Sequence, residues 1–265
     1  EQRFAQFKHA QAAMILPTGY MANLAAITAL ASEGDLICAD KLNHASLHDG
    51  ARLSGAAVRV FPHLNNDKLE KLLQRHSAGH RFIVTDSIFS MDGDTADLPG
   101  LCDLADRYDA MLIVDEAHAT GVLGETGTGL CELQGVSERV DVVISTASKA
   151  LGSLGGIITA KQEVIDTLVN RARPFIYTTS AMPAQVAAIA ASLDVIRDEP
   201  HRRKRVLEMA RRVSSDSPTP IIAIMAGESQ TALKLSEHLR EKGFYAPAIR
   251  PPTVAPGAAR VRLSL

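Results

Sequence analysis

The sequence predicts an α/β protein with an open, mostly parallel sheet and helices on both of its faces, followed by a smaller α+β domain. Short apolar runs alternate with segments of helical periodicity over the first 180 residues, which is typical of strand–helix units in a parallel sheet. From Pro183 onward this alternation gives way to two long helices and then to separate strands. We therefore expect a large α/β domain at residues 1–180 and a small α+β domain at residues 181–265.

The elements of the large domain follow from these patterns in chain order. Thr18-Gly19 opens the first helix, and Leu69, Leu72 and Leu73 give a later helix its apolar face. The helices are expected at Tyr20–Ser32, Ala45–Ser54, Asp67–His76 and Leu98–Tyr108. The strands are expected at Leu36–Ala39, Ala57–Phe61, Arg81–Thr85, Met111–Asp115 and Asp141–Ser145.

The small domain is predicted to be incomplete at its end. Its expected helices are Ala184–Ile196, Arg202–Val213 and Ser229–Lys242. The segment Ile221–Met225 lies between the second and the third helix, and a final strand is expected at Val261–Leu265. The segment from Ser214 to Pro218 joins the second helix to Pro220 abruptly. Because the chain begins at Glu1 rather than Met and ends inside a strand, we expect it to be a piece of a longer protein.

Composition excludes several classes of function. The chain has 265 residues, 46% of them apolar, and a formal net charge of −2, so no basic stripe suggests a nucleic-acid partner. The basic cluster at residues 201–205, with Arg211 and Arg212, is interpreted as a solvated helix face. Three scattered cysteines favour a reducing compartment. A reducing compartment corresponds to the cytoplasmic location that we expect. No apolar run reaches transmembrane length.

One lysine and one aspartate are the main evidence for the chemistry of this protein. An apolar strand ends in Ser145-Thr146-Ala147-Ser148 and leads to Lys149, and the strand Met111–Val114 leads to Asp115. A lysine amine can form a Schiff base with an aldehyde, and a buried carboxylate needs a cationic partner such as a protonated ring nitrogen. The two residue types, each at the carboxyl end of a strand, predict a pyridoxal phosphate site.

Further residues near strand and helix ends suit the same cofactor. His44 begins a helix, where its imidazole can stack on a planar ring. Gly19 and Tyr20 open the first helix with exposed N–H groups that suit a phosphate. Ser87, Ser90 and Thr146 are hydroxyls at strand ends, able to bind phosphate or orient the ring. Each of these signals also has a plain structural interpretation, such as an ordinary turn or helix start.

Two other chemistries fit parts of the sequence. Asp115-Glu116-Ala117-His118 spells the DEAH box of helicases, but the required phosphate loop GxxxxGK[ST] is missing. His44 and His48 have the spacing of zinc ligands, but no third ligand with matching context follows. We therefore predict no metal site.

The sequence also resembles a known family over nearly its whole length. It is similar to the α-oxoamine synthase group of fold-type I pyridoxal phosphate enzymes, whose aminotransferase-like fold has a mostly parallel sheet of the seven-stranded type. The motifs that carry this resemblance are Asn43-His44-Ala45-Ser46, Ser90-Met91-Asp92-Gly93-Asp94, Asp115-Glu116-Ala117-His118, Ser145-Thr146-Ala147-Ser148-Lys149 and Ile176-Tyr177-Thr178-Thr179-Ser180.

The resemblance implies a role for each matched residue. Lys149, Asp115 and His44 would be catalytic, with His44 also stacking on the ring. Cofactor contacts would come from Gly19, Tyr20, Ser90, His118 and Thr146, and from Thr178 and Thr179 toward a neighbouring subunit of a homodimer. Thr253 and Arg262 would bind substrate, with the guanidinium of Arg262 suited to a carboxylate. The family also has a stretch that is missing between Val213 and Ser214.

The implied reaction is a decarboxylative condensation of an amino acid with an acyl thioester. Residues 249–254 and 259–265 are most similar to members that join L-alanine to a pimeloyl thioester in biotin biosynthesis. Two alternatives remain open. One is a sibling enzyme that condenses glycine with a short thioester or serine with a long-chain one, and the other is an inactive, partner-binding relative.

Overall fold

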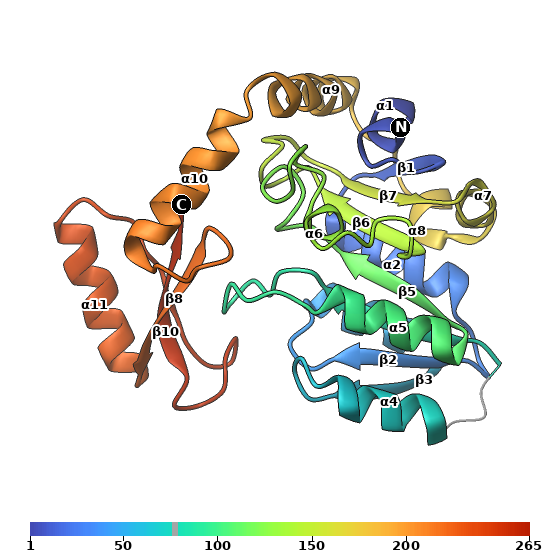
Figure 1. Cartoon of the computed structure of the whole chain (residues 1–265), viewed down its shortest axis with the longest axis horizontal. Coiled ribbons are helices and arrows are strands. Elements are labelled where there is room, and N and C mark those ends of the chain that lie inside the picture. The colour runs from blue at the N-terminus through green and yellow to red at the C-terminus, as the bar shows by residue number, and fades with distance from the viewer. Residues whose placement is uncertain (76–78) are drawn as a thin grey trace. The chain divides into compact units, whose positions relative to one another are not determined.

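The structure is a computed structural model that describes residues 1–75 and 79–265 (Figure 1). The chain divides into two compact units. The larger unit comprises Glu1–Ile88 and Ala96–Pro200, and the smaller unit comprises Phe89–Thr95 and His201–Leu265. This division differs from the expected boundary after residue 180, because the helix α9 (Pro183–Asp198) belongs to the larger unit.

Helix α9 is attached to the larger unit by its apolar face. Ile189, Leu193 and Ile196 are buried in one cluster with Phe4 of the first helix, α1 (Gln2–Phe7). The hydroxyl of Ser192 donates to the carbonyl oxygen of Leu151 at 2.6 Å. A break in the sequence pattern at Pro183 thus marks the start of a helix rather than the end of the compact unit.

A seven-stranded sheet forms the centre of the larger unit, in the order β1-β7-β6-β5-β4-β2-β3. The strands are β1 (Ala12–Leu16), β2 (Leu36–Asp40), β3 (Ala57–Phe61), β4 (Arg81–Asp86), β5 (Ala110–Asp115), β6 (Val142–Thr146) and β7 (Gly156–Ala160). Only β7 runs against the others, because it pairs antiparallel with both β1 and β6. The mostly parallel sheet and the fold-type I class predicted from the sequence are confirmed.

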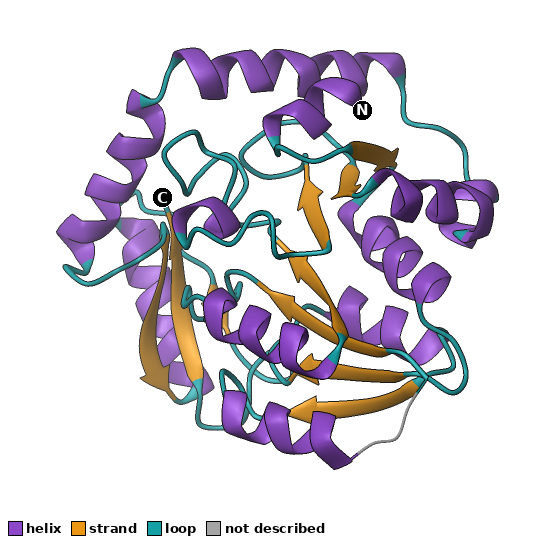
Figure 2. Cartoon of the chain, turned by 45° about the vertical axis from the view of Figure 1, so that its right-hand side comes forward, coloured by secondary structure: helices purple, strands orange, loops and turns teal. Residues whose placement is uncertain are grey.

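Helices cover both faces of this sheet (Figure 2). Helix α2 (Gly19–Leu30) and helix α7 (Gln162–Arg171) pack on one face, and α5 (Leu98–Tyr108) packs on β4 and β5. The other helices are α3 (Ala45–Leu53), α4 (Asn66–Arg75), α6 (Leu130–Leu133) and α8 (Arg173–Ile176). His76, the expected last residue of α4, lies outside the described residues.

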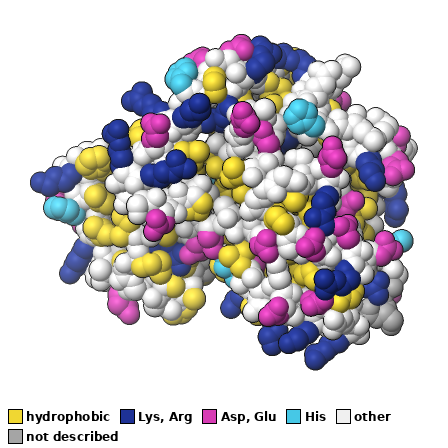
Figure 3. Space-filling view, viewed as in Figure 1, with side chains coloured by type: hydrophobic (Ala, Val, Ile, Leu, Met, Phe, Trp, Pro, Cys, Tyr) yellow, Lys and Arg dark blue, Asp and Glu magenta, His cyan; other side chains and the backbone are white. Residues whose placement is uncertain are grey.

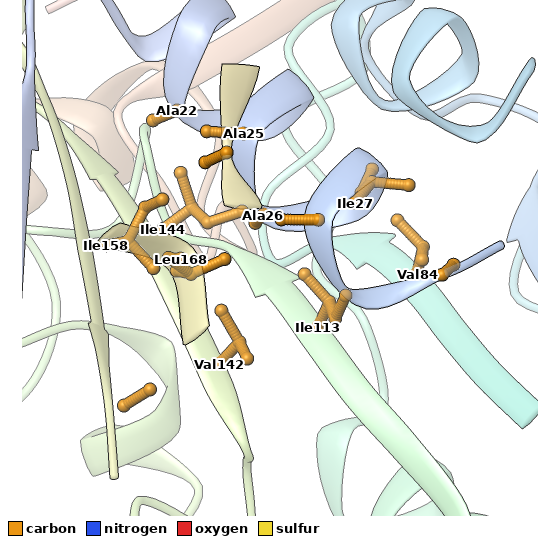
Figure 4. Packing of buried hydrophobic residues seen from close by; sticks show 14 of the residues in the cluster. Ala22, Ala25, Ala26, Ile27, Val84, Ile113, Val142, Ile144, Ile158 and Leu168 are labelled. Carbon is orange, nitrogen blue, oxygen red and sulfur yellow. The ribbon is translucent and has the colours of Figure 1, made fainter. Parts of the chain in front are cut away.

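The core beneath α2 is built from small residues on the helix and branched residues on the strands (Figure 4). Ala22, Ala25 and Ala26 are fully buried against strand residues such as Ile144 and Ile158. Small side chains allow the helix axis to lie close to the sheet, and the branched side chains fill the pleated surface. This close packing fixes the position of α2, whose first turn reaches the carboxyl edge of the sheet.

The smaller unit pairs helices with a three-stranded antiparallel sheet. Its elements are α10 (His201–Val213), β8 (Ile221–Gly227), α11 (Ser229–Glu241), β9 (Ala248–Ile249) and β10 (Ala259–Ser264), with the strand order β8-β10-β9. The turn at residues 89–95 belongs to this unit, because Thr219 Oγ1 donates to the carbonyl oxygen of Gly93 at 2.7 Å and Arg260 pairs with Asp92.

Charged side chains of both signs are interspersed on the visible face of the larger unit (Figure 3). Within the described residues, no helix combines the length and the apolar character needed to cross a bilayer.

Candidate active site

The candidate site lies at the carboxyl edge of the parallel strands. Four of these strands end in polar residues, with Asp40 last in β2, Asp86 last in β4, Asp115 last in β5 and Thr146 last in β6. Parallel register places Asp86 directly beside Asp115, and Ile144 of β6 beside Asp115 on its other side. Ligands of open α/β sheets bind at this edge, so the strands deliver the predicted carboxylate where a cofactor can reach it.

The carboxylate of Asp115 is buried and firmly held. Asn23 Nδ2 donates to Asp115 Oδ2 at 2.7 Å, and the backbone N–H of Ala117 donates to Oδ1 at 2.8 Å. The N–H and the hydroxyl of Ser87 both donate to the Asp115 carbonyl oxygen. An ionised carboxylate offers about four acceptor positions, so two hydrogen bonds leave room for one further donor such as a pyridinium N–H.

His44 is held at the start of α3 by a short chain of polar contacts. Its Nδ1 lies 2.7 Å from Ser46 Oγ, and Asn23 Nδ2 donates to the same oxygen at 2.8 Å. Since Asn23 also binds Asp115, one amide group connects the histidine to the carboxylate. The residue expected to stack on the ring and the residue expected to bind its nitrogen are therefore positioned together.

The first turn of α2 forms the opposite end of the site. Thr18 is the N-cap, and its hydroxyl accepts a hydrogen bond from Met21 N at 3.2 Å. A side chain on Gly19 would lie 3.1 Å from Thr146 Oγ1, and that hydroxyl lies 3.0 Å from Ser148 Oγ. Free N–H groups of a helix start beside two hydroxyls make a cradle that suits the phosphate of the predicted cofactor.

Lys149 follows this cradle directly. It is exposed, in the loop after β6, where Gly152 N donates to the Lys149 carbonyl oxygen at 3.0 Å. Its ammonium group acts electrostatically on the buried carboxyl of Asp86, the neighbour of Asp115. The lysine, the carboxylate, His44, Thr146 and the helix start thus gather at one sheet edge. The residues present fit pyridoxal phosphate at both its ring and its phosphate end.

The remaining predicted residues are divided between the units. His118 lies in the turn after β5, and Thr178 and Thr179 follow α8, all in the larger unit, with Thr179 exposed. Ser90, Thr253 and Arg262 belong to the smaller unit. Ser90 sits on the turn that Arg260 and Thr219 hold, and Thr253 is exposed.

Arg262 is a suitable anion-binding residue. It is half-buried in β10, and burial lowers the pKa of its guanidinium. Its Nε is buried and has no hydrogen-bond partner within the described parts of the chain. A half-buried guanidinium with an unused donor is suited to a carboxylate, which matches the substrate contact that the family resemblance implies.

The structure adds three residues that sequence reasoning missed. Asp86 ends an apolar run, Phe82–Val84 followed by Thr85, in the same way as Asp115, so that pattern was a usable signal. Asn23 lies inside α2, where nothing in the local sequence marks it, and Ser46 lies inside α3, where it belongs to the motif at residues 43–46 but was given no role of its own. Their roles arise only from the packing of these helices against each other and the sheet.

The alternative chemistries receive no support from this geometry. Glu116, the second residue of the DEAH pattern, is buried in an ion pair with Lys8, with Nζ 2.6 Å from Oε2. Among the described residues, no group of three His, Cys, Asp or Glu side chains is arranged to hold a metal ion.

Comparisons with known proteins decide the family. The model of the aminotransferase class I and II family matches residues 1–265. This chain belongs to that family. It is 45% identical over 276 residues to 8-amino-7-oxononanoate synthase of Stutzerimonas stutzeri, covering all of this chain and 70% of the relative. It is 43% identical to the enzyme of the same name from Geobacter sulfurreducens over 279 residues, covering 100% of this chain and 71% of the relative.

Solved structures give the same fold. The serine palmitoyltransferase of Sphingomonas wittichii superimposes on this chain with a TM-score of 0.96 and is 32% identical to it. The match covers 100% of this chain and 70% of the palmitoyltransferase chain. The 8-amino-7-oxononanoate synthase of Francisella tularensis superimposes with a TM-score of 0.84 and is 30% identical. The match covers 100% of this chain and 79% of the synthase chain. Another similar structure, at 30% identity, holds pyridoxal phosphate. The chain is accordingly an enzyme of the acyltransferase type with pyridoxal phosphate as its cofactor.

Proposed function

We propose that this chain catalyses the decarboxylative condensation of L-alanine with a pimeloyl thioester to 8-amino-7-oxononanoate, a step of biotin biosynthesis. The observation that carries the proposal is the 45% identity to the Stutzerimonas stutzeri synthase along the whole chain. The site supports it, because the sheet edge supplies a lysine, a held carboxylate and an anion cradle in one place.

The proposed roles follow from where each side chain lies. Lys149 would hold the cofactor through its amine, and the same amine would remove the proton from Cα of the bound amino acid. Asp115 keeps a proton on the ring nitrogen, and its bond from Asn23 orients the carboxylate for that task. His44 covers the ring. When bound, pyridoxal phosphate supplies an electron sink for the negative charge that develops at Cα.

Other residues bind and orient. The N–H groups at Gly19 and Tyr20, together with the hydroxyl of Thr146, bind the cofactor phosphate. His118 and Ser90 would contact the cofactor on its ring-oxygen or phosphate side. Arg262, with its unused Nε, holds a substrate carboxylate, and Thr253 assists it.

We further propose that the chain works as a cytoplasmic homodimer in which Thr178 and Thr179 reach the cofactor phosphate of the partner. Large apolar side chains beside these threonines support an interface, since Tyr177 is 73% exposed and Met182 is 61% exposed. Light scattering during size-exclusion chromatography would give the mass of the particle. A monomer that is fully active would contradict this proposal.

The test of the reaction is the mass of the product. Incubation with L-alanine and a pimeloyl thioester, on coenzyme A and separately on an acyl carrier protein, is expected to release thiol and 8-amino-7-oxononanoate. The variant Lys149→Ala should release neither and should lack the visible absorbance of the lysine-bound cofactor. If that variant retained turnover, or the wild type gave no product with either carrier, the proposed reaction would be wrong.

A second candidate function is the condensation of L-serine with a long-chain thioester. The observation that favours it is the TM-score of 0.96 with serine palmitoyltransferase, above the 0.84 with the Francisella tularensis synthase. Sequence identity favours the first candidate, because the value for the Stutzerimonas stutzeri relative is 45% and that for the palmitoyltransferase is 32%. The same assay with glycine, L-alanine and L-serine against short, pimeloyl and palmitoyl thioesters separates them.

A further inference from the structure

Two carboxylates stand side by side at the centre of this site. Asp86 and Asp115 are register partners at the ends of adjacent parallel strands, and only about 5% of each residue is exposed. Neighbouring strands lie about 4.8 Å apart, and register partners point to the same face of the sheet. Two buried carboxylates at this separation cannot both be ionised without a large electrostatic cost.

The hydrogen bonds around the pair are unequal. Asp115 accepts two, from the Asn23 amide and the Ala117 N–H. The Asp86 carboxyl accepts one within the described residues, from the backbone N–H of His44 to Oδ2 at 2.7 Å. Donated hydrogen bonds stabilise the ionised form, so the proton of the pair belongs on Asp86.

The charges that face Asp86 agree with this assignment. Burial and the negative charge of Asp115 raise the pKa of Asp86 well above its ordinary value, and Asp40 at the end of β2 adds to the effect. The His44 N–H and the ammonium group of Lys149 oppose it. Asp40 itself is occupied elsewhere, because it pairs with His63 Nδ1 at 2.9 Å and accepts the N–H groups of Leu42 and Leu64.

The pair is also connected by a chain of polar contacts that runs through His44, Ser46 and Asn23. Asp86 holds the backbone of His44, whose ring contacts Ser46. Ser46 contacts Asn23, and Asn23 binds Asp115. A shift of the Asp86 carboxyl would therefore move the ring of His44 and, through Ser46 and Asn23, disturb the carboxylate of Asp115.

We propose that Asp86 is a positioning residue that stays protonated at neutral pH, so that it fixes His44 while leaving Asp115 as the only anion of the pair. The part of this inference that concerns catalysis rests on the proposed function. The protonation state does not, because it belongs to the protein alone. A neutral Asp86 and an anionic Asp115 would present one negative charge to the ring nitrogen and keep the neighbouring position uncharged.

The first experiment needs neither cofactor nor substrate. Infrared spectra of the protein without cofactor, recorded at pH 7, should show the carbonyl band of a protonated carboxyl group. The band should disappear in Asp86→Asn and persist in the matched control Asp40→Asn, which changes a buried carboxyl at the end of the adjacent strand. A band that Asp86→Asn leaves unchanged, or no such band in the wild type, would overturn the proposal whatever reaction the enzyme catalyses.

The second experiment uses the enzyme with its cofactor. Asn reproduces the shape and the neutral charge of protonated Asp, so Asp86→Asn should keep kcat within about threefold of the wild type. Asp86→Ala removes the acceptor for His44 and should lower kcat by about tenfold, the equivalent of one hydrogen bond. Asp115→Asn should lower kcat by about a hundredfold or more. If Asp86→Asn were as damaging as Asp115→Asn, Asp86 would have to act as an anion, and the inference would be wrong.

Absorbance of the bound cofactor provides a readout that a purely structural role would not change. If Asp86 ionises at alkaline pH, the absorbance of the wild-type cofactor should change over that pH range. This change should be missing in Asp86→Asn. If the product assay fails but the infrared band and the spectrum behave as expected, the proposed reaction is wrong and this inference stands. If Asp40→Asn altered the pH dependence of the cofactor spectrum as much as Asp86→Asn does, the proposed role of Asp86 would be contradicted.

Discussion

The buried ion pair between Lys8 and Glu116 gives the most direct test of how the site is supported. Lys8 Nζ lies 2.6 Å from Glu116 Oε2 and 2.8 Å from Thr120 Oγ1, and it also donates to the Thr128 carbonyl oxygen. The side chains of Lys8 and Glu116 are 4% and 1% exposed, respectively. Glu116 accepts the N–H of Cys131 at 2.7 Å through its other oxygen. This cluster fixes the turn that follows Asp115.

Replacing Lys8 with Met keeps most of the side-chain volume and removes all three donated hydrogen bonds. Glu116 is then a buried carboxylate without its cation, and we expect the free energy of unfolding to fall by about 3–5 kcal/mol. That is a large part of the roughly 5–15 kcal/mol by which domains are stable. Urea unfolding followed by circular dichroism measures the change.

Two further variants decide whether the charge is responsible. Lys8→Met combined with Glu116→Gln removes the uncompensated charge and should restore part of the lost stability. Arg3→Met breaks the exposed ion pair with Asp194, whose side chains are 51% and 43% exposed, and should cost about 1 kcal/mol or less. The reasoning is refuted if Lys8→Met costs no more than Arg3→Met, or if the double variant is less stable than Lys8→Met.

Four other predictions follow from individual contacts. The folded-state pKa of Asp86 is raised, so wild-type stability relative to Asp86→Asn should fall as pH rises above about 4, by up to about 1.4 kcal/mol per pH unit in urea unfolding. Thr18→Ala removes the N-cap of α2 and should cost about 1 kcal/mol in the same assay. Gly156→Ala would place a methyl group 2.7 Å from Ala22 Cβ, and closer to the Thr18 carbonyl oxygen, costing about 1–3 kcal/mol in thermal unfolding. Burial raises the pKa of the Cys38 thiol to about 12 and that of Cys102 to about 11, so a disulfide reagent at pH 8 should titrate these thiols only after unfolding.

Local sequence patterns predicted the elements whose periodicity is unambiguous. The strand Ala57–Phe61 and the helix Leu98–Tyr108 have the expected ends. The strands β1 and β7 were missed. Both have five residues, like the predicted strand Ala57–Phe61, so length does not explain the difference. Strand β7 begins with Gly156, and glycine is depleted in strands, whereas β1 has no local feature that explains why it was missed. Their place in the sheet depends on pairing with each other, which no local pattern expresses.

The candidate site was predictable to the extent that its residues end strands or start helices. Asp115 and Lys149 met that condition, and the structure gathers them with Thr146 and Gly19 at one edge. Asn23 did not meet it. The contacts of a polar residue in the middle of an apolar helix cannot be predicted until the position of the helix on the sheet is known. The functional assignments themselves stay predictions, for which the variants above provide tests.

Helix α2 explains why the two ends of the site are held at a fixed separation. Its first turn, at Gly19, faces the hydroxyl of Thr146, and Asn23, one turn later, binds the carboxylate of Asp115. Four residues of helix span about 6 Å, a rigid spacing between the anion cradle and the carboxylate. The buried alanines of α2 and the close approach of Gly156 fix the helix against the strands that carry Thr146 and Asp115. The distance between the ends of the cofactor site is thus set by apolar packing rather than by the polar residues themselves.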